Sequence, residues 1–445
     1  MKIAILGAGF TGLSAAFRLL QKGYQVTIFE KEESSGGLAV GFKLANWQWS
    51  LEKGYHHWFT NDDSILHLAK EINHQVIIER PSTDVFTHGK RLPFDSATTL
   101  INFRYLPIID RVRVALILAF LKILPSHHLL DGKKALPWIR KFMGEKSTKL
   151  IWNPLFTSKF GKFSEQIALT WFWARIKKRT PSLAYPQEGF QAFADHLGKE
   201  IKKMGGEILL NTQVVELVSR NNDVVVKTTN YPLRDFRRRR REASQLPTTN
   251  YYFDKVIVTL PSPIFTKIAH GLPKQYTDRI TSIPHLHAQV LILILNKPFM
   301  DKTYWLNITE KDFPFLILAE HTNFMDSKYY GGQHILYIGN YLPPDHPYLK
   351  MTVKELLKVF DPFLKKINPN YQLHTTNYQL FIGPFAQPIV TVDYPNLIPS
   401  FTTPLKGVYL ANLDMVYPWD RGTNYAVELG EKIADMIDKD HAKVK

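Results

Sequence analysis

The sequence contains no cysteine, and this absence excludes several kinds of chemistry at once. Without a thiol the chain can form no disulfide, no cysteine-ligated zinc site, no cysteine nucleophile and no cysteinyl bond to a cofactor. No charged-then-apolar leader follows Met1, so we expect no signal peptide. Long apolar runs are also missing. In the first half of the chain the longest spans residues 114–121, well below the roughly 20 residues that a membrane span needs.

What the chain does contain is an ordinary globular composition with a strong excess of positive charge. Hydrophobic residues make up 45% and charged residues 22% of the 445 residues, which is typical of a folded protein with two domains. The 56 Lys and Arg against 40 Asp and Glu give a net charge of +16. A charge this far from zero indicates a polyanionic partner, such as nucleic acid, an anionic membrane surface or a phosphorylated ligand.

The first thirty residues have the pattern of a strand, a helix and a second strand. Residues 2–6 and 25–29 are short apolar strands, and between them a helix follows the G-x-G-x-x-G motif Gly7-Ala8-Gly9-Phe10-Thr11-Gly12. The glycines permit a tight turn, close approach of a pyrophosphate and close packing of helix on strand. Glu30, at the end of the second strand, is placed to accept hydrogen bonds from ribose hydroxyls. The motif predicts a dinucleotide site.

The residues after Glu30 carry a family resemblance. Glu30-Lys31 followed by Gly36-Gly37-Leu38 resembles the extended FAD signature of the amine oxidase, protoporphyrinogen oxidase and phytoene desaturase superfamily. In that superfamily the glycine pair lies beside the diphosphate and the ribityl chain. The resemblance implies non-covalently bound FAD and a cofactor site that includes Gly7, Ala8, Gly9, Thr11, Gly12, Glu30, Lys31, Gly36, Gly37 and Leu38.

The resemblance continues in the middle and at the end of the chain. Asn211-Thr212-Gln213-Val214 is similar to the family strand whose valine holds the adenine ring, which implies Val214 as a contact. Residues 408–414 resemble the C-terminal strand that ends in an acid, here Asp414, although Asn412 replaces a family glycine. Residues 421–427 occupy the place where family backbone amides meet the flavin, which implies contacts at Thr423, Asn424 and Tyr425. Tyr425 also replaces a family glycine. Residues 152–161 and 171–175 look like the substrate-domain signature of the protoporphyrinogen oxidase-like branch.

The cofactor motifs occur at the start, middle and end of the chain, with unlike segments between them. We therefore expect an α/β Rossmann-like FAD-binding domain that is interleaved with an α+β substrate domain of mixed helix and sheet. The FAD-binding domain would comprise residues 1–80, 185–265 and 381–445, and the substrate domain residues 81–184 and 266–380. Residues 228–252, which contain the five arginines Arg237 to Arg241, have the composition of a basic loop insertion.

Three residues are candidates for catalysis. His56 and His57 lie in the segment that the superfamily places over the isoalloxazine ring, where they could act as acid or base or anchor an anionic substrate. Arg421 precedes the C-terminal helix and is expected to approach the flavin from the other side. The alternatives are structural histidines bonded to backbone and a structural ion pair of Arg421. We find no metal-binding helix and expect no metal site.

Two classes of function remain open. The first is an FAD-dependent oxidoreductase of oxidase or desaturase type, which transfers a hydride to flavin from a hydrophobic small molecule of polyprenyl or lipid type, as the resemblance implies. The alternative is a non-redox flavoenzyme similar to UDP-galactopyranose mutase that acts on a nucleotide-sugar. Residues 56–62 and 91–95 resemble short segments of that enzyme. No nucleic-acid-binding fold accompanies the arginine run, so we expect no specific nucleic-acid partner. Nothing in the sequence predicts an oligomeric state.

The charge distribution predicts contact with a membrane surface. Residues 103–149 contain ten Lys and Arg against three Asp and Glu, and they include the apolar run 114–121 between Arg111, Arg113 and Lys122. A short apolar helix with basic flanks can lie in the interface of an anionic leaflet. We therefore expect a cytoplasmic enzyme with peripheral association at the inner membrane face. In the alternative, residues 114–121 form a buried core helix.

Overall fold

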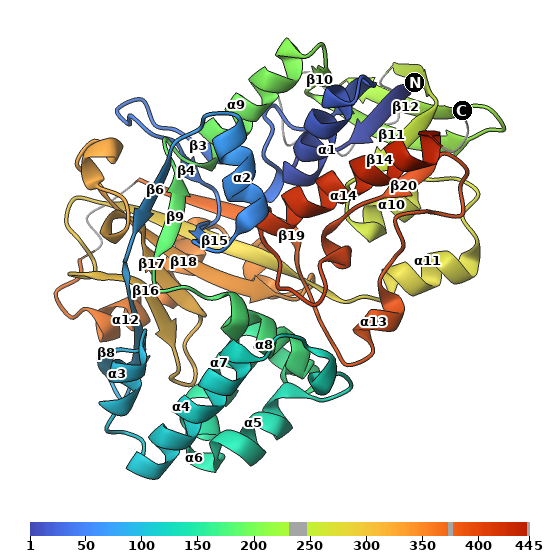
Figure 1. Ribbon diagram of the computed structural model, residues 1–445. Helices are drawn as coiled ribbons and strands as arrows, with labels where there is room; N and C mark the ends of the chain where they lie inside the picture. The colour runs from blue at the N-terminus through green and yellow to red at the C-terminus, as the bar shows by residue number, and fades with distance from the viewer. Residues whose placement is uncertain (231–246, 373–376, 443–445) are drawn as a thin grey trace.

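The computed structural model describes residues 1–230, 247–372 and 377–442, and its parallel sheet is assembled from distant parts of the chain. The strand order is β10-β2-β1-β14-β20, and every neighbouring pair is parallel. The strands are β1 (Lys2–Leu6), β2 (Gln25–Phe29), β10 (Glu207–Leu209), β14 (Lys255–Val258) and β20 (Val408–Leu410). Figure 1 shows the two chain ends near this sheet. The α/β fold class is confirmed.

The two faces of the parallel sheet are covered by different layers, as the two-residue repeat of a strand requires. Ile3 and Ile5 of β1 belong to the core beneath α1 (Phe10–Gln21), α9 (Phe190–Lys203) and α14 (Thr423–Ala442). Ala4 and Leu6 point the other way, into the core shared with a three-stranded antiparallel sheet. Its strands are β11 (Thr212–Ser219), β12 (Val224–Asn230) and β13 (Thr248–Phe253).

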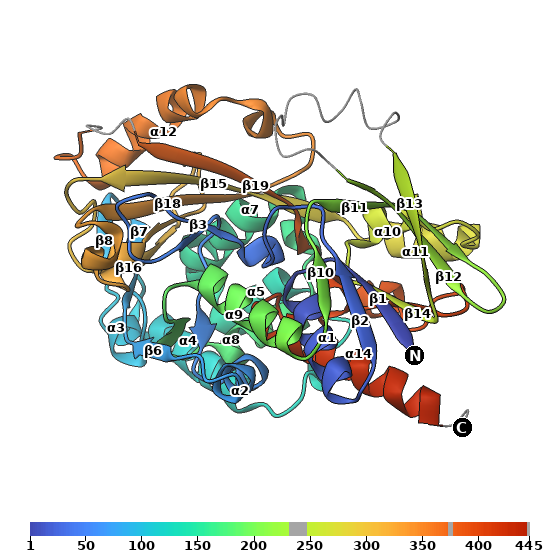
Figure 2. The same ribbon diagram turned by 90° about the horizontal axis from the view of Figure 1, so that it is seen from above.

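A seven-stranded sheet forms the other half of the molecule. Its order is β19-β15-β18-β17-β16-β7-β8, and β15 (His285–Leu295) pairs antiparallel with both neighbours. Val290, Ile292 and Ile294 of β15 face the central core, whereas Leu291, Leu293 and Leu295 pack under α12 (Val353–Ile367). Figure 2 shows α12 on the outer face of this sheet. The other strands are β7 (Ser82–Thr87), β8 (Lys90–Pro93), β16 (Thr303–Ile308), β17 (Ile317–Glu320), β18 (His334–Leu342) and β19 (Tyr378–Pro388).

A layer of short helices lies below this sheet in Figure 1. It contains α3 (Ala97–Ile101), α4 (Ile108–Ile123), α5 (Ala135–Met143), α6 (Glu145–Ser147), α7 (Asn153–Phe160) and α8 (Leu169–Lys178). Trp152, Trp171 and Trp173 are each less than a tenth exposed and belong to the main core. The tryptophans of this segment therefore serve mainly to pack the helices together.

Shorter elements connect these layers. Two small antiparallel sheets contain β3 (Gly41–Phe42) with β4 (Leu51–Glu52), and β5 (Trp58–Phe59) with β9 (Leu183–Pro186) and β6 (Val76–Glu79). The remaining α-helices of the described residues are α2 (Asp63–Glu71), α10 (Ser262–Ile268), α11 (Lys274–Thr281) and α13 (Tyr394–Leu397). Arg18 of α1 forms ion pairs with Glu71 and Glu431, both at 2.7 Å, and so joins α1 to α2 and α14.

The structure corrects the prediction of a basic loop over residues 228–252. β12 continues to Asn230 and β13 begins at Thr248, so both ends of that segment are paired strands. Thr, Tyr and Phe residues at these two ends supply the strand preference that the arginine run obscured. Arg237 to Arg241 lie outside the described residues. β19 runs across the expected domain boundary at residue 381, because residues 378–383 pair with β15 without interruption. The division into two interleaved domains otherwise stays a prediction.

Among the helices of the described residues, none combines the length and the apolar character that crossing a membrane requires.

Candidate functional site

The predicted cofactor residues at the start of α1 form a narrow cradle of backbone. Gly9 is the N-cap of α1 and no side chain caps the helix, so the N–H groups of its first turn are open to an anion. A Cβ atom on Gly37 would lie 3.0 Å from the Cα of Gly9, and a Cβ atom on Gly12 would lie 2.0 Å from the carbonyl oxygen of Gly7. Only glycine allows these approaches. The cradle fits the diphosphate of a dinucleotide.

Glu30 lies at the edge of this cradle with its carboxylate fixed by backbone groups. Ala8 donates its N–H to one carboxylate oxygen at 2.8 Å and Glu32 donates to the other at 3.0 Å. Burial raises the pKa of Glu30, and the two backbone hydrogen bonds oppose that rise. The N–H of Thr212 bonds to the carbonyl oxygen of Glu30 at 2.8 Å, which brings the start of β11, and with it Val214, to the same edge. These residues fit the adenosine half of FAD.

Other predicted cofactor residues meet this region through backbone alone. The N–H of Gly36 bonds to the carbonyl oxygen of Ala8 at 2.9 Å. Thr11 is buried in the first turn of α1. Lys31 pairs with Glu32 at 3.4 Å on the surface, and Leu38 is exposed. The side chains of Lys31 and Leu38 therefore point away from the cradle's buried edge.

Asp414 has a structural environment that the sequence did not indicate. Its carboxylate lies 2.6 Å from Nε2 of His285 and accepts a hydrogen bond from Ser262 at 2.5 Å. The side chain of Asn412 accepts the N–H of Asp414 at 3.1 Å. Both carboxylate oxygens thus bond to protein groups in a fully buried position. The side chain joins the end of β20 to α10 and β15.

The first turn of α14 presents backbone rather than side chains. Trp58 donates its indole N–H to Thr423 at 2.8 Å, and Asn424 accepts the N–H of Ile65 at 3.1 Å. Tyr425 is buried and its ring is parallel to that of Trp419, with 6.0 Å between centroids. The side chains of Thr423, Asn424 and Tyr425 thus contact other residues of the protein. The groups left to meet a ligand at this helix end are the backbone N–H donors of its first turn. They match the flavin contacts that the resemblance implies.

His56 and His57 are both neutral at physiological pH. Desolvation lowers the pKa of His56 to about 4, further lowered by Arg421, and the pKa of His57 to about 3, further lowered by Arg179 and Arg175. Nδ1 of His56 lies 2.6 Å from the carbonyl oxygen of Gly54, so Nδ1 must carry the proton and Nε2 is left as an acceptor. The backbone contact is the one expected for a structural histidine.

Arg421 lies over an aromatic ring at the inner face of the seven-stranded sheet. Its guanidinium carbon is 4.8 Å from the ring centroid of Tyr341, and its Nε donates to Gln387 at 3.0 Å. Within the described parts of the chain, its two terminal nitrogens make no hydrogen bond or ion pair. The hydroxyl of Tyr55 lies 3.4 Å from that of Tyr341. Tyr55 directly precedes His56, so these two contacts with Tyr341 bring His56 and Arg421 into one region.

A charged cluster beside Arg421 was missed at the level of sequence. Asp420 accepts the indole N–H of Trp171 at 3.0 Å and a guanidinium N–H of Arg175 at 2.9 Å, and Nζ of Lys159 is 3.8 Å away. Burial raises the pKa of Asp420, but Lys159 and Arg175 lower it below its usual value. Desolvation lowers the pKa of Lys159 to about 7, although Asp420 opposes this effect. One carboxylate is therefore shared by two cations, with the guanidinium of Arg421 close by.

Arg179 follows the end of α8 and adds a further cation beside Arg175. Desolvation lowers the pKa of Arg179 to about 10, with a further contribution from Arg175. The spacing of Trp171, Arg175 and Arg179 places them on one face of α8. That four-residue spacing is the signal by which the sequence could have revealed the cluster.

Lys159 gives the first testable prediction. Its pKa is about 7 in the folded protein against an ordinary 10.5, so between these values the unfolded chain binds more protons and stability rises with pH. Lys159→Met removes the buried charge, while Asp420 keeps Arg175 and Trp171. We expect the midpoint of thermal unfolding at pH 6.5 to rise by about 2 °C, on the order of 1 kcal/mol, and this gain to shrink at pH 9.5. Calorimetry at both pH values is the measurement, with exposed Lys149→Met as control. A lower midpoint at pH 6.5 would show that the ion pair stabilises the fold.

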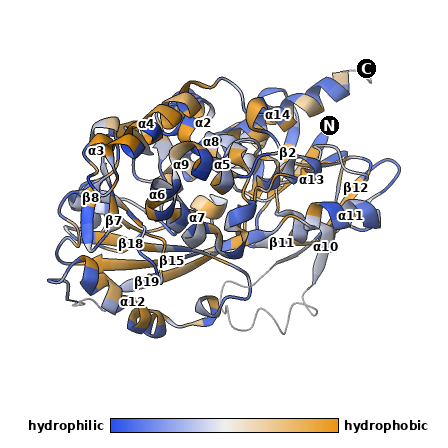
Figure 3. Ribbon diagram, turned by 90° about the horizontal axis from the view of Figure 1, so that it is seen from below, coloured by the Kyte–Doolittle hydropathy of each residue, from blue (hydrophilic) through white to orange (hydrophobic). Residues whose placement is uncertain are grey.

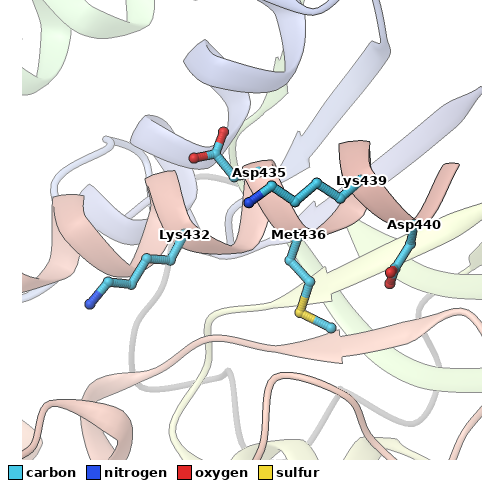
Figure 4. A pocket seen from close by; sticks show the side chains of 5 residues that line it. All are labelled: Lys432, Asp435, Met436, Lys439 and Asp440. Atoms are coloured by element: carbon cyan, nitrogen blue, oxygen red, sulfur yellow. The ribbon is translucent and has the colours of Figure 1, made fainter. Parts of the chain in front are cut away.

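Two other features lie apart from this region. Figure 4 shows a surface hollow lined by Lys432, Asp435, Met436, Lys439 and Asp440, all from the C-terminal half of α14. Asp435 pairs with Lys22 at 3.2 Å, so its charge is already compensated. The structure also gathers His127, His128 and Asp131 within 4.8 Å, where a metal could bind although the sequence predicted none. Asp131 bonds to both histidines, at 2.8 and 3.3 Å, which explains the cluster without an ion.

Comparisons with known proteins agree with this arrangement. The family model described as flavin-containing amine oxidoreductase matches residues 10–437. A 4,4'-diapophytoene desaturase of Staphylococcus haemolyticus is 63% identical over 43 residues, which cover 10% of this chain and 9% of that enzyme. The chain thus matches only a small part of the length of this relative.

Two solved structures share the fold over nearly the whole chain. A protein described as a protoporphyrinogen oxidase from Exiguobacterium sp. 255-15 superimposes with a TM-score of 0.73 at 15% identity, covering 99% of each chain. A reduced UDP-galactopyranose mutase gives a TM-score of 0.71 at 16% identity, covering 98% of this chain and 95% of the other. At such identities the likeness concerns the fold alone. The family match across residues 10–437 shows that this chain belongs to the flavin-containing amine oxidoreductases.

Proposed function

We propose that this enzyme oxidises a hydrophobic small molecule of polyprenyl or lipid type that carries an anionic group. Bound FAD, held without a covalent bond, supplies the acceptor for a hydride. The observation that carries the proposal is the cluster around Arg421, where aromatic side chains from the seven-stranded sheet and α8 lie beside more cations than anions. The residues are Tyr55, Trp171, Tyr341, Lys159, Arg175, Arg179, Arg421 and Asp420.

The aromatic residues supply the apolar part of the cluster around Arg421. Trp305 meets Tyr55 edge to face at 5.0 Å between centroids, and Nζ of Lys159 lies 4.8 Å from the ring of Trp171 and 5.4 Å from that of Tyr341. Such aromatic side chains exclude water and hold an apolar substrate with little specificity for polar groups. The short matches to carotenoid desaturases support a polyprenyl-like substrate.

The unpaired cations supply the orienting group. Arg421 has a guanidinium edge without a partner among the described residues, and Asp420 neutralises only one of its two neighbours Lys159 and Arg175. A carboxylate or phosphate of the substrate would complete this charge balance. Neutral His56, with Nε2 free to accept, is the candidate to receive a proton from the substrate when the hydride leaves.

The second candidate is the nucleotide-sugar mutase reaction, and the same cations favour it. A diphosphate is the anion that several arginines bind best, and a mutase shares the fold. The aromatic side chains around Arg421 favour the oxidoreductase over the mutase, since a nucleotide-sugar needs polar partners throughout its length.

Anaerobic mixing of the FAD-loaded protein with three probes distinguishes the oxidoreductase reaction from the mutase reaction. The probes are geranylgeranyl phosphate, uncharged 4,4'-diapophytoene and UDP-galactopyranose. We expect the absorbance of oxidised flavin to bleach with a polyprenyl probe, and geranylgeranyl phosphate to bind more tightly than the uncharged chain. If neither polyprenyl probe bleaches the flavin, while the dithionite-reduced protein isomerises UDP-galactopyranose, the oxidoreductase proposal is wrong.

A further inference from the structure

The outer side of α4 is an apolar strip on the molecular surface. Ile108, Ile109, Val112, Leu116, Phe120 and Ile123 are between 40% and 76% exposed. Their spacing of three to four residues places them on one face of the helix. On the opposite face, Val114 and Leu121 are fully buried, so α4 is neither a core helix nor a freely solvated one. We call the six exposed residues the α4 strip.

The strip concentrates the exposed apolar surface of the molecule. Nine of the fifteen large hydrophobic side chains that are exposed among the described residues lie between residues 101 and 129. The three beyond the strip are Ile101, Tyr105 and Leu129. Figure 3 shows α3 and α4 as hydrophobic segments at the edge of the helical layer. Single exposed hydrophobic residues need no explanation, but a contiguous patch of this kind marks a surface that is covered in use.

The charges around the strip are almost all positive. Asp110 is the only acidic residue between 101 and 130; it is buried and lies 3.8 Å from Arg113. Arg104 and Arg113 are exposed beside the strip, and Lys122 follows at its end. A second copy of this chain would present the same positive charge, so the strip is poorly suited to pairing with itself. The charge complements an anionic surface instead.

We propose that the α4 strip docks this enzyme on an anionic lipid bilayer. The helix has 16 residues, or about 24 Å at 1.5 Å per residue, which is shorter than the roughly 30 Å of a bilayer core. It therefore lies along the interface, with its apolar side chains among the acyl chains and the exposed Arg104 and Arg113 at the headgroups. The alternative of a buried core helix for residues 114–121 is wrong, since only one face of α4 is packed in the core.

The docked helix is directly joined to the candidate site. Nζ of Lys122 donates to the carbonyl oxygens of Lys177 at 2.9 Å and Arg179 at 2.6 Å, at the end of α8. The same helix supplies Trp171 and Arg175, which bind Asp420. The docking itself does not depend on the proposed substrate.

Vesicle flotation of the FAD-loaded protein tests the proposal. We expect binding to vesicles of phosphatidylcholine with 30% phosphatidylglycerol, little binding to phosphatidylcholine alone, and a fall in binding when NaCl is raised from 50 to 500 mM. Each basic side chain at the surface contributes about five-fold to affinity, so Arg104→Gln with Arg113→Gln should weaken binding by about 25-fold. Ile109→Ser with Leu116→Ser should weaken it by at least about ten-fold.

A matched control keeps the test specific. Ile78→Ser removes an equally exposed isoleucine on β6 and should leave flotation unchanged. Flavin absorbance and the unfolding midpoint of every variant check that the fold is intact. Equal binding to neutral and anionic vesicles, no binding at all, or an equal loss in Ile78→Ser overturns the proposal. A wild-type dimer that the strip variants convert to monomer, without vesicle binding, would assign the strip to self-association instead.

Discussion

Replacing Gly9 by valine should yield a folded but colourless protein. Gly9 has φ of −73° and ψ of 175°, a conformation that any residue can adopt, so the change introduces no backbone strain. A Cβ atom there would be 3.8 Å from the Cα of Gly37, an ordinary contact. The larger side chain fills the space in which the diphosphate must approach the start of α1. We expect FAD affinity to fall by about a thousand-fold, or about 4 kcal/mol.

Side chains of increasing size at Gly9 distinguish a steric block of the diphosphate site from a general loss of folding. Gly9→Ala should retain part of the affinity, whereas Gly9→Val should not, and both should keep the wild-type circular dichroism. Gly198→Ala, on α9 where the added Cβ meets only Ile208 at 3.5 Å, should bind FAD normally. The measurement is a fluorescence titration of apoprotein with FAD. Normal FAD binding by Gly9→Val would remove the cradle from the cofactor site.

Arg421→Gln should give the second large effect, and it should act on substrate rather than on cofactor. Glutamine keeps a hydrogen-bond donor near Gln387 but removes the charge that the anionic group of the substrate would meet. Loss of a charged partner in a desolvated site costs about 3 kcal/mol, so kcat/KM should fall by about a hundred-fold, mainly through KM. FAD content should not change, because the cradle lies at α1.

Arg279→Gln is the control for this variant. Arg279 also lies near a tyrosine ring, at 5.6 Å from the centroid of Tyr276. It is exposed on α11 and is not part of the cluster around Arg421. Its replacement should leave kcat/KM unchanged. An Arg421→Gln enzyme with wild-type KM and kcat would show that Arg421 is a structural residue held by Gln387 and Tyr341.

Much of the cofactor half could be predicted from sequence because its signals are local. The strand at residues 25–29 was predicted with the bounds that the structure has, since a βαβ unit combines glycines, strand residues and a helix stop within thirty residues. Val214 joins the same edge because the N–H of Thr212 bonds to the carbonyl oxygen of Glu30. That contact spans 182 residues and was inferred through resemblance, not through any local pattern.

The substrate half shows where sequence reasoning fails. The sequence analysis identified the segment before α14 that contains Asp420. Lys159 and Arg175 lie on other helices, so no local pattern shows that both form ion pairs with the carboxylate of Asp420. The role of Asp414 was obscured for the same reason, because its partner His285 is 129 residues away. Residues 114–121 were predicted as an interfacial helix, but the exposed face of α4 could not be identified from the sequence, since burial of one helix face depends on what packs against it.

A crystal structure of the protein with FAD is the most direct test of the central claim, which is that the cluster at Arg421 faces the flavin ring. We expect the diphosphate between Gly9 and Gly37, and the isoalloxazine ring at the N-terminus of α14, with at least one of His56, His57 and Arg421 within a side-chain length of it. Density that places the ring more than about 12 Å, or two extended side chains, from all three residues would contradict the account.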